Sequence, residues 1–178
     1  MSVTIPSDSD RAVIAVGSRS VSLTNLRKPF WHDLGLTKRD LIQYYADASE
    51  WLLPHLFDRA MVMKRYPNGA QGDFFYMKRA PRPRPEWIQV CPIPHQRGNV
   101  IEFPLVQDEP SLLWLVNLGC IDLHPWYARC HDYDQPDFLI FDLDPVVGAD
   151  FEQVTAAALM IREQLSTLEM PSYPKTSG

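Results

Sequence analysis

Phe-Leu-Ile-Phe-Asp-Leu-Asp-Pro, residues 138–145, is the most informative stretch of this 178-residue sequence. Its first four residues, Phe138 to Phe141, form a short apolar run of the kind that makes a buried strand. Successive side chains on a strand point to opposite faces, so Asp142 and Asp144 are expected on one face. Two adjacent carboxylates at the end of a buried strand are costly unless a cation neutralises them. We therefore predict that Asp142 and Asp144 bind Mg²⁺ or Mn²⁺, hard ions that take carboxylate oxygens.

The composition around this stretch is that of a folded chain. The hydrophobic fraction of 46% excludes wholesale disorder. No apolar run approaches the roughly 20 residues that a membrane-spanning helix needs, and the polar residues 1–10 do not resemble a signal peptide. Cys91, Cys120 and Cys130 are an odd number of cysteines without a disulfide spacing, which is typical of a reducing compartment. These features predict a cytoplasmic protein.

Charge is distributed unevenly along the chain. The net charge of −5 argues by itself against a nucleic-acid partner. Residues 11–100, however, hold 14 Lys and Arg against 7 Asp and Glu, whereas residues 101–178 hold 3 against 13. A basic half and an acidic half suggest a surface that grips phosphate beside an acidic cluster that binds metal.

Periodicity and capping residues predict a mixed α and β chain. Thr37, with Asp40 three positions on, is expected to begin a helix that ends near Pro54. The apolar face of this helix is predicted to contain Leu41, Tyr44, Tyr45, Ala48 and Leu52. Further helices are expected at residues 109–118 and after a capping Asp150, through Leu165. Strands are expected at residues 12–16, 60–66, 74–77, 87–90, 100–103, 121–124 and 138–142. Residues 1–20 are otherwise expected to be mobile, and the element order favours an α+β fold.

Eight short segments occur in a recognisable order. They are Leu23-Thr24-Asn25, residues 36–42, residues 51–56, residues 64–69, Phe74-Phe75, residues 123–126, residues 141–145 and residues 173–178. Together they resemble the polymerase domain of bacterial ligase D, of the archaeo-eukaryotic primase superfamily, which serves non-homologous end joining. The resemblance implies a primase-polymerase-like core over residues 21–178, with an antiparallel-rich mixed sheet and flanking helices.

The resemblance implies a nucleotidyltransferase site. Asp142 and Asp144 match the family's catalytic, metal-binding aspartates, where two metal ions would stabilise the attacking 3′-oxygen and the departing pyrophosphate. Lys64 and His124 match residues at the site of the incoming nucleoside triphosphate. Lys175 and Ser177 match further nucleotide-binding residues in the Tyr-Pro-Lys-Thr-Ser-Gly segment.

The resemblance also implies a site for a broken DNA end. Lys28 and Lys38 match lysines that hold the 5′-phosphate, and a lysine near a helix N-terminus gains the dipole's attraction for anions. Phe74 and Phe75 match an aromatic pair that stacks on the template base. Because neighbours on a strand face opposite ways, we expect one ring in the core and the other at the DNA. The implied further partners are a DNA ligase and the end-binding Ku protein, with no membrane and a nucleoid location.

The sequence departs from the family pattern near residue 178. The family's module is longer, and continues to a second histidine and a third catalytic aspartate, for which this sequence has no counterpart. We therefore expect the C-terminal part of the module to be missing and the chain to be weakly active or inactive alone. An incomplete sheet is also expected to favour self-association.

Four alternatives remain open at this stage. The chain could be a non-catalytic module that binds 5′-phosphorylated DNA ends. Hydrophobic-Asp-x-Asp also opens haloacid-dehalogenase-like phosphatases, in which the first Asp is the nucleophile, but those enzymes usually place it near the N-terminus. Asp142 and Asp144 could be solvated turn residues. Zinc could bind Cys120, His124, Cys130 and His131, although their spacing is not that of a paired-cysteine site.

Overall fold

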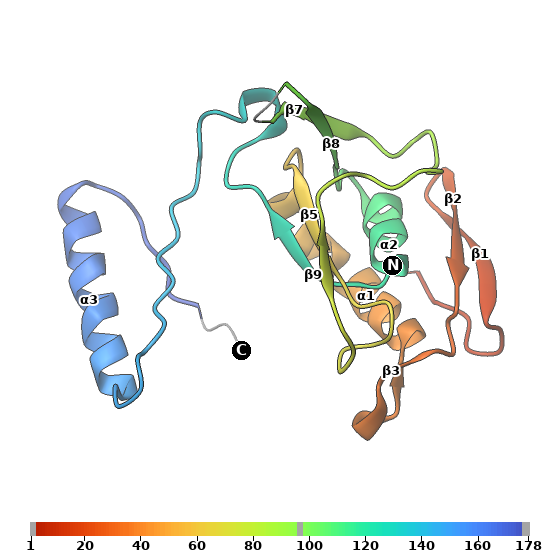
Figure 1. Ribbon diagram of the computed structural model, residues 1–178, viewed down its shortest axis with the longest axis horizontal. Coiled ribbons are helices and arrows are strands. Elements are labelled where there is room, and N and C mark those ends of the chain that lie inside the picture. Colours follow the sequence, from red (N-terminus) through yellow and green to blue (C-terminus); the bar gives the residue numbers. More distant parts are fainter. Residues whose placement is uncertain (1–2, 96–97, 176–178) are drawn as a thin grey trace. The chain divides into compact units, whose positions relative to one another are not determined.

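Residues 3–95 and 98–175 are described by the computed structural model, and they divide into two units between Phe138 and Leu139 (Figure 1). The first unit contains, in chain order, β1 (Arg11–Val16), β2 (Arg19–Thr24), β3 (Pro29–Trp31), η1 (His32–Leu34), β4 (Leu36–Thr37), α1 (Lys38–Leu56), β5 (Met61–Arg65), β6 (Phe75–Met77), β7 (Val90–Pro94), β8 (Val100–Pro104), α2 (Glu109–Asn117), β9 (Cys120–Pro125) and η2 (Cys130–Asp132). The second unit contains α3 (Phe151–Thr167). Every strand pair in the described residues is antiparallel. The α+β prediction is confirmed.

The chain begins with a tight hairpin. Strands β1 and β2 pair from Arg11 with Thr24 to Val16 with Arg19, so only two residues form the turn. Gly17 occupies this turn with a φ of 59°, a left-handed conformation that glycine adopts at little cost. The buried residues of β2, Val21 and Leu23, alternate with exposed ones and pack in the core.

Helix α1 begins as its capping residues predict. The backbone N–H of Thr37 donates to the Asp40 carboxylate at 2.8 Å, and the Thr37 hydroxyl donates to it at 2.7 Å. The predicted apolar face is wrong at Tyr44, which is 66% exposed. Tyr45 points inward instead and donates its hydroxyl to the backbone carbonyl of Ile121 in β9 at 2.6 Å. Neighbouring side chains on a helix point about 100° apart, and here Tyr45 faces the core while Tyr44 faces solvent.

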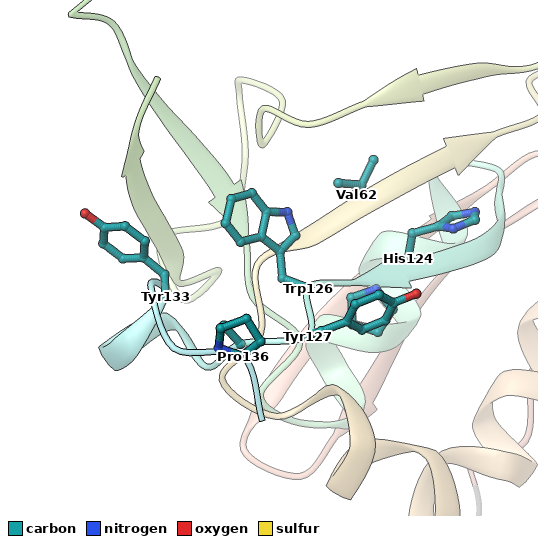
Figure 2. A pocket seen from close by; sticks show the side chains of 8 residues that line it. Val62, His124, Trp126, Tyr127, Tyr133 and Pro136 are labelled. Atoms are coloured by element: carbon teal, nitrogen blue, oxygen red, sulfur yellow. The ribbon is translucent and has the colours of Figure 1, made fainter. Parts of the chain in front are cut away.

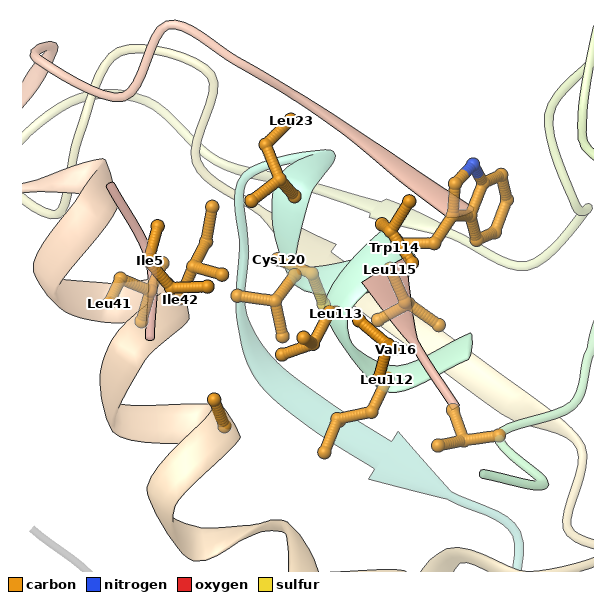
Figure 3. Close-up of a cluster of buried hydrophobic side chains, with 14 of the residues drawn as sticks. Ile5, Val16, Leu23, Leu41, Ile42, Leu112, Leu113, Trp114, Leu115 and Cys120 are labelled. Atoms are coloured by element: carbon orange, nitrogen blue, oxygen red, sulfur yellow. The ribbon is translucent and has the colours of Figure 1, made fainter. Parts of the chain in front are cut away.

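Helix α2 occupies the centre of the first unit, and all its side chains from Pro110 to Val116 are buried. It packs against α1, β2 and β9. Figure 3 shows its residues meeting those of α1 and the β1–β2 hairpin. A helix that is apolar on every side must be enclosed by other elements, and its burial organises the core.

Three strands form the sheet that carries the site, in the order β6-β5-β9. Met63 of β5 pairs with Met77 of β6 and Leu123 of β9, and all three pack on the core. Their neighbours in sequence face the other way. One face of the sheet is therefore core, and the opposite face is available for function.

A second, smaller cluster lies under the β7–β8 hairpin, where Cys91, Ile93 and Phe103 are buried. Cys91 forms a disulfide with Cys130, which follows β9. The sequence showed no disulfide spacing, but the fold brings together these two cysteines, which are 39 positions apart. Cys120 alone is a free, buried thiol.

The strand predicted at residues 138–142 is absent from the described structure. Residues 138–147 are irregular. The apolar run is exposed, with exposed fractions of 49% for Phe138, 60% for Leu139, 57% for Ile140 and 50% for Phe141. A strand needs a neighbour to satisfy its backbone N–H and C=O groups, and no described strand pairs with this segment.

The second unit is built around α3. Asp150 caps the helix as predicted, accepting a hydrogen bond from the Gln153 backbone N–H at 2.9 Å. Its half-buried side chains are Val154, Ala157, Ala158, Ile161 and Leu165, which form a single helical stripe. No helix in the described part of the chain is long and apolar enough to cross a membrane.

Candidate nucleic-acid interface

The open face of the β6-β5-β9 sheet holds Lys64 at its centre. Lys64 of β5 pairs in register with Tyr76 of β6 and with Asp122 of β9. Its ammonium lies 3.1 Å from the Asp122 carboxylate and 4.4 Å from the centre of the Phe74 ring. The Tyr66 hydroxyl donates to the same carboxylate at 3.0 Å. Interactions with Tyr66 and then with Asp122 raise the pKa of Lys64, so its positive charge is secure at neutral pH.

Phe74 and Phe75 lie on opposite faces, but neither is in the core. Phe74 joins Lys64 on the open face and is 50% exposed. Phe75 lies over the Arg65 guanidinium, 5.3 Å from it, and is 43% exposed. The prediction of one buried ring was therefore wrong, because β6 is an edge strand and Phe75 begins it, where the sheet ends.

His124 of β9 lies on the open face, beside Tyr76, with 5.7 Å between the ring centres. It is exposed and pairs in register with Val62. His124 also borders a cavity of about 420 Å³. Its other lining residues include Trp126, Tyr127 and Tyr133 (Figure 2). His124 therefore stands between the aromatic sheet face and an apolar hollow.

Lys28 and Lys38 come together at the start of α1. The Lys38 backbone N–H donates to the Lys28 carbonyl at 2.8 Å. The Lys28 ammonium donates to the Pro67 carbonyl at 2.6 Å, whereas that of Lys38 donates to the Thr24 carbonyl at 2.7 Å. Lys38 is only 4% exposed. Burial, followed by the positive charges of Lys28 and Arg65, lowers the pKa of Lys38 to about 8.

The turn at Pro67-Asn68-Gly69 holds this basic pair in place. Gly69 has a φ of 89°, and a Cβ there would come within 3.0 Å of the Pro29 and Phe30 carbonyl oxygens. The turn therefore packs directly on β3, where only glycine fits. This contact brings the Pro67 carbonyl to Lys28.

Asp142 and Asp144 lie in the irregular, exposed segment of the second unit. Carboxylate oxygens are suitable ligands for Mg²⁺ or Mn²⁺. Among residues 3–95 and 98–175, however, no group of three or more His, Cys, Asp or Glu side chains is placed to hold a metal ion. The carboxylates of Asp142 and Asp144 are suitable ligands for a divalent cation, but the described structure places no third such side chain beside them.

Two more predicted nucleotide-binding residues lie near the C-terminus. Lys175 is exposed in the second unit, and Ser177 lies outside the described residues. The zinc alternative loses a ligand, because the sulfur of Cys130 is bonded to Cys91.

The family model for the LigD primase-polymerase domain matches residues 37–178. The chain belongs to this family. Two relatives from non-homologous end joining support the assignment. The multifunctional LigD protein of Mycolicibacterium smegmatis is 30% identical over 160 residues, which cover 89% of this chain and 21% of that protein. The bifunctional LigD protein of Bacillus subtilis is 32% identical over 158 residues, or 89% of this chain and 25% of that protein. The chain thus spans about a quarter or less of these relatives.

A solved structure has the same fold as this LigD-family chain. The polymerase domain of Mycobacterium tuberculosis ligase D in complex with DNA matches with a TM-score of 0.74 and 24% identity. The match covers 89% of this chain and 57% of that one. The primase-polymerase-like fold predicted from the sequence is therefore confirmed.

Sequence reasoning missed three residues of this candidate interface, Tyr66, Tyr76 and Asp122. Alternation along Phe74-Phe75-Tyr76 could have placed Tyr76 on the Phe74 side. Asp122 gave no local signal, because its partner Lys64 comes from a strand distant in sequence.

Proposed function

We propose that this chain is a DNA-end-binding nucleotidyltransferase module, of polymerase or primase type, in non-homologous end-joining repair of double-strand breaks. One observation carries the proposal beyond the family. Lys64, Phe74 and His124, which the resemblance assigns to nucleotide and template, share one open sheet face. A cation and aromatic rings on one face suit phosphate and base together.

Each group on the first unit has a defined task in this proposal. Phe74 stacks on the template base at the break, and Lys64 and His124 hold the incoming nucleoside triphosphate. Lys28 and Lys38 hold the 5′-phosphate of the DNA end as point charges, for which lysine is suited. A phosphate would also relieve the mutual repulsion of the Lys28 and Lys38 charges.

Asp142 and Asp144 are proposed to hold Mg²⁺ or Mn²⁺. When bound, two such ions supply charge stabilisation for the attacking and departing oxygens of nucleotidyl transfer. The aspartates' own task is to hold these ions through their carboxylates.

The location and partners are part of the same proposal. We propose action in the cytoplasm, at the nucleoid, together with a DNA ligase and Ku. We also propose that the isolated chain self-associates through the exposed residues 138–141.

A non-catalytic DNA-end-binding module is the second candidate, because the paired lysines and the aromatic face belong to one unit that lacks both aspartates. The haloacid-dehalogenase-like reading is not favoured by the family match.

Primer extension tests the proposal. The substrate is a 5′-phosphorylated gapped duplex with Mn²⁺ and ribonucleotides, and the matched variants are Asp142→Ala and the surface change Asp134→Ala. Extension that is lost in Asp142→Ala but kept in Asp134→Ala supports catalysis. Binding that depends on the 5′-phosphate, with no extension by the wild type, supports the binding module. Binding that ignores the 5′-phosphate, with no extension, contradicts both.

A further inference from the structure

Four aromatic side chains form a continuous row on the open face of the β6-β5-β9 sheet. The ring centres are 5.5 Å apart for Tyr66 and Phe74, 5.8 Å for Phe74 and Tyr76, and 5.7 Å for Tyr76 and His124. Tyr76 thus links Phe74, the proposed template ring, to His124, the proposed nucleotide ligand. No role has yet been given to Tyr76.

The exposure of this row is unusual for aromatic rings. Tyr76 is 57% exposed and Phe74 is 50% exposed, although the reverse face of the same strands is packed into the core. A contiguous patch of exposed aromatic side chains usually marks a binding site. The row is therefore suited to bind a ligand with flat, apolar faces.

Charge around the row identifies the chemistry of that ligand. The Lys64 ammonium lies 4.4 Å from the Phe74 ring centre and 5.4 Å from that of Tyr66. Residues 61–80 hold four Lys and Arg against one Asp. Aromatic rings interleaved with cations bind single-stranded nucleic acid by stacking on bases and attracting phosphates.

The angles between the rings favour an unpaired strand over a duplex. The Tyr76 ring is inclined by 84° to Phe74 and by 69° to His124. Base pairs in a duplex are nearly parallel, so they could not stack on both Phe74 and Tyr76. Bases of a flexible single strand can turn from one ring to the next.

We propose that Tyr76 is a second base-stacking residue, which extends the Phe74 platform toward His124 for an unpaired overhang of any sequence. The inference rests on the proposed function, because the overhang is that of the bound DNA end. The contact uses the ring rather than the hydroxyl, so phenylalanine can replace tyrosine there.

Fluorescence anisotropy with three variants tests this inference. The probe is a 5′-phosphorylated duplex with a 3′ oligothymidine overhang. Tyr76→Ala is expected to raise its dissociation constant about tenfold, and Tyr76→Phe to leave it within about twofold. Tyr44→Ala is the matched control, since Tyr44 is 66% exposed on α1 and has a T-shaped contact with Tyr45 at 5.5 Å. It should leave binding unchanged.

Salt dependence separates stacking from charge. The slope of log Kd against log salt should be the same for Tyr76→Ala and the wild type, whereas Lys64→Ala should lower it by about one. Equal overhang binding by Tyr76→Ala and the wild type would overturn the inference. Equal losses in Tyr76→Ala and Tyr76→Phe would also overturn it.

Photocrosslinking gives a readout that does not depend on a folded alanine variant. A wild-type complex with 5-iodouracil in the overhang is irradiated, and the adducts are mapped by mass spectrometry. A crosslink at Tyr76 supports the inference, and crosslinks confined to peptides outside β6 contradict it.

A bare oligothymidine, without duplex or 5′-phosphate, distinguishes this inference from the proposed function. Binding to it that depends on Tyr76, in a protein without extension or 5′-phosphate preference, would support stacking and reject the proposed function. Extension and overhang affinity that are both unchanged in Tyr76→Ala would support the proposed function and reject the stacking role of Tyr76.

Discussion

The Lys64 ammonium lies 3.1 Å from the Asp122 carboxylate, which also accepts a hydrogen bond from Tyr66. Lys64 lies on the central strand β5 and Asp122 on the edge strand β9 of the sheet that carries the aromatic row. The lysine that we propose to bind phosphate therefore already has a carboxylate partner, and the two anions would compete for one cation.

Asp122→Asn is expected to strengthen anion binding at Lys64. Asparagine keeps an acceptor for the Tyr66 hydroxyl but removes the competing charge, and a half-exposed pair contributes about 1 kcal/mol or less. Affinity for inorganic triphosphate, measured by calorimetry, should rise about two- to fivefold. Asp47→Asn on α1 is the control and should have no effect. Weaker binding by Asp122→Asn would mean that the carboxylate mainly positions Lys64.

Recognition of the 5′-phosphate should weaken at alkaline pH through Lys38. Its pKa falls from 10.5 to about 8, chiefly because it is buried. Lys38 is therefore charged at pH 7 and loses its proton as the pH rises through about 8. The affinity ratio between 5′-phosphorylated and 5′-hydroxyl ends should decline from pH 7 to 9. In Lys38→Met the ratio should be low and flat with pH; a decline that persists would assign the titration to another group.

The same depressed pKa has a consequence for stability. Below pH 8, Lys38 is protonated in both the folded and the unfolded chain. The free-energy cost of burying its charged ammonium therefore lowers the stability of the fold in full there. Between about pH 8 and 10.5 the unfolded chain holds more protons, and this contribution makes the fold more stable as the pH rises. Urea midpoints of the wild type and Lys38→Met should therefore converge across this range. A constant difference would contradict the assigned pKa.

Phe74→Ala should impair overhang binding more than Phe75→Ala. Phe74 lies with Lys64 on the open face, whereas Phe75 lies over Arg65 on the other face. Loss of one stacked base contact corresponds to about 1–3 kcal/mol, so a difference of about tenfold in dissociation constant is expected. Both variants remove one half-exposed ring, which makes each the control for the other. A larger loss in Phe75→Ala would move the template to the opposite face.

Asp137→Asn should destabilise the first unit. Arg59 is 1% exposed and donates to the two Asp137 oxygens at 2.7 and 2.6 Å, so this buried charge would lose its ionic partner. We expect a loss of about 2–3 kcal/mol at pH 7 by urea unfolding, less than for a fully buried pair because Asp137 is half-exposed. Asp134→Asn in the same loop is the control.

The Asp137 effect should depend on pH. Hydrogen bonding to Arg59 lowers the pKa of Asp137. The pair's stabilisation is therefore present above the unfolded pKa of about 3.9 and is lost as the pH falls through the lower folded value. A difference between wild type and Asp137→Asn that is as large at pH 2 as at pH 7 would rule out this cause.

Reduction of Cys91–Cys130 should also destabilise the first unit. The bond closes a loop of 39 residues, for which chain entropy gives about 4 kcal/mol. Dithiothreitol should lower the melting temperature of the wild type but not that of the Cys91→Ala/Cys130→Ala variant. A wild type that is indifferent to dithiothreitol would mean that the bond adds little to folding.

Local signals in the sequence predicted local structure well. The hydrogen bonds that begin α1 and α3 each join residues only three positions apart, so Thr37 with Asp40 and Asp150 with Gln153 could be read directly. The turn at Gly69 is equally local. The eight ordered segments identified the family, which the family model confirms.

Other features depend on contacts between distant parts of the chain. The apolar residues 138–141 resemble a strand, but strand formation requires a paired neighbour, which a sequence window does not contain. Phe75 is exposed because β6 is an edge strand. The alternation of side chains along a strand does not tell where that strand lies in the sheet.

The sequence by itself determined the family, the α+β class, the helix starts and the candidate residues, because these depend on residue type and short spacing. Only the tertiary structure decided that Lys64, Tyr76, Asp122 and His124 share one face, that Lys28 lies beside Lys38, and that Cys91 meets Cys130. These relationships arise from strand register and from packing around the buried helix α2, which join side chains that no local pattern connects.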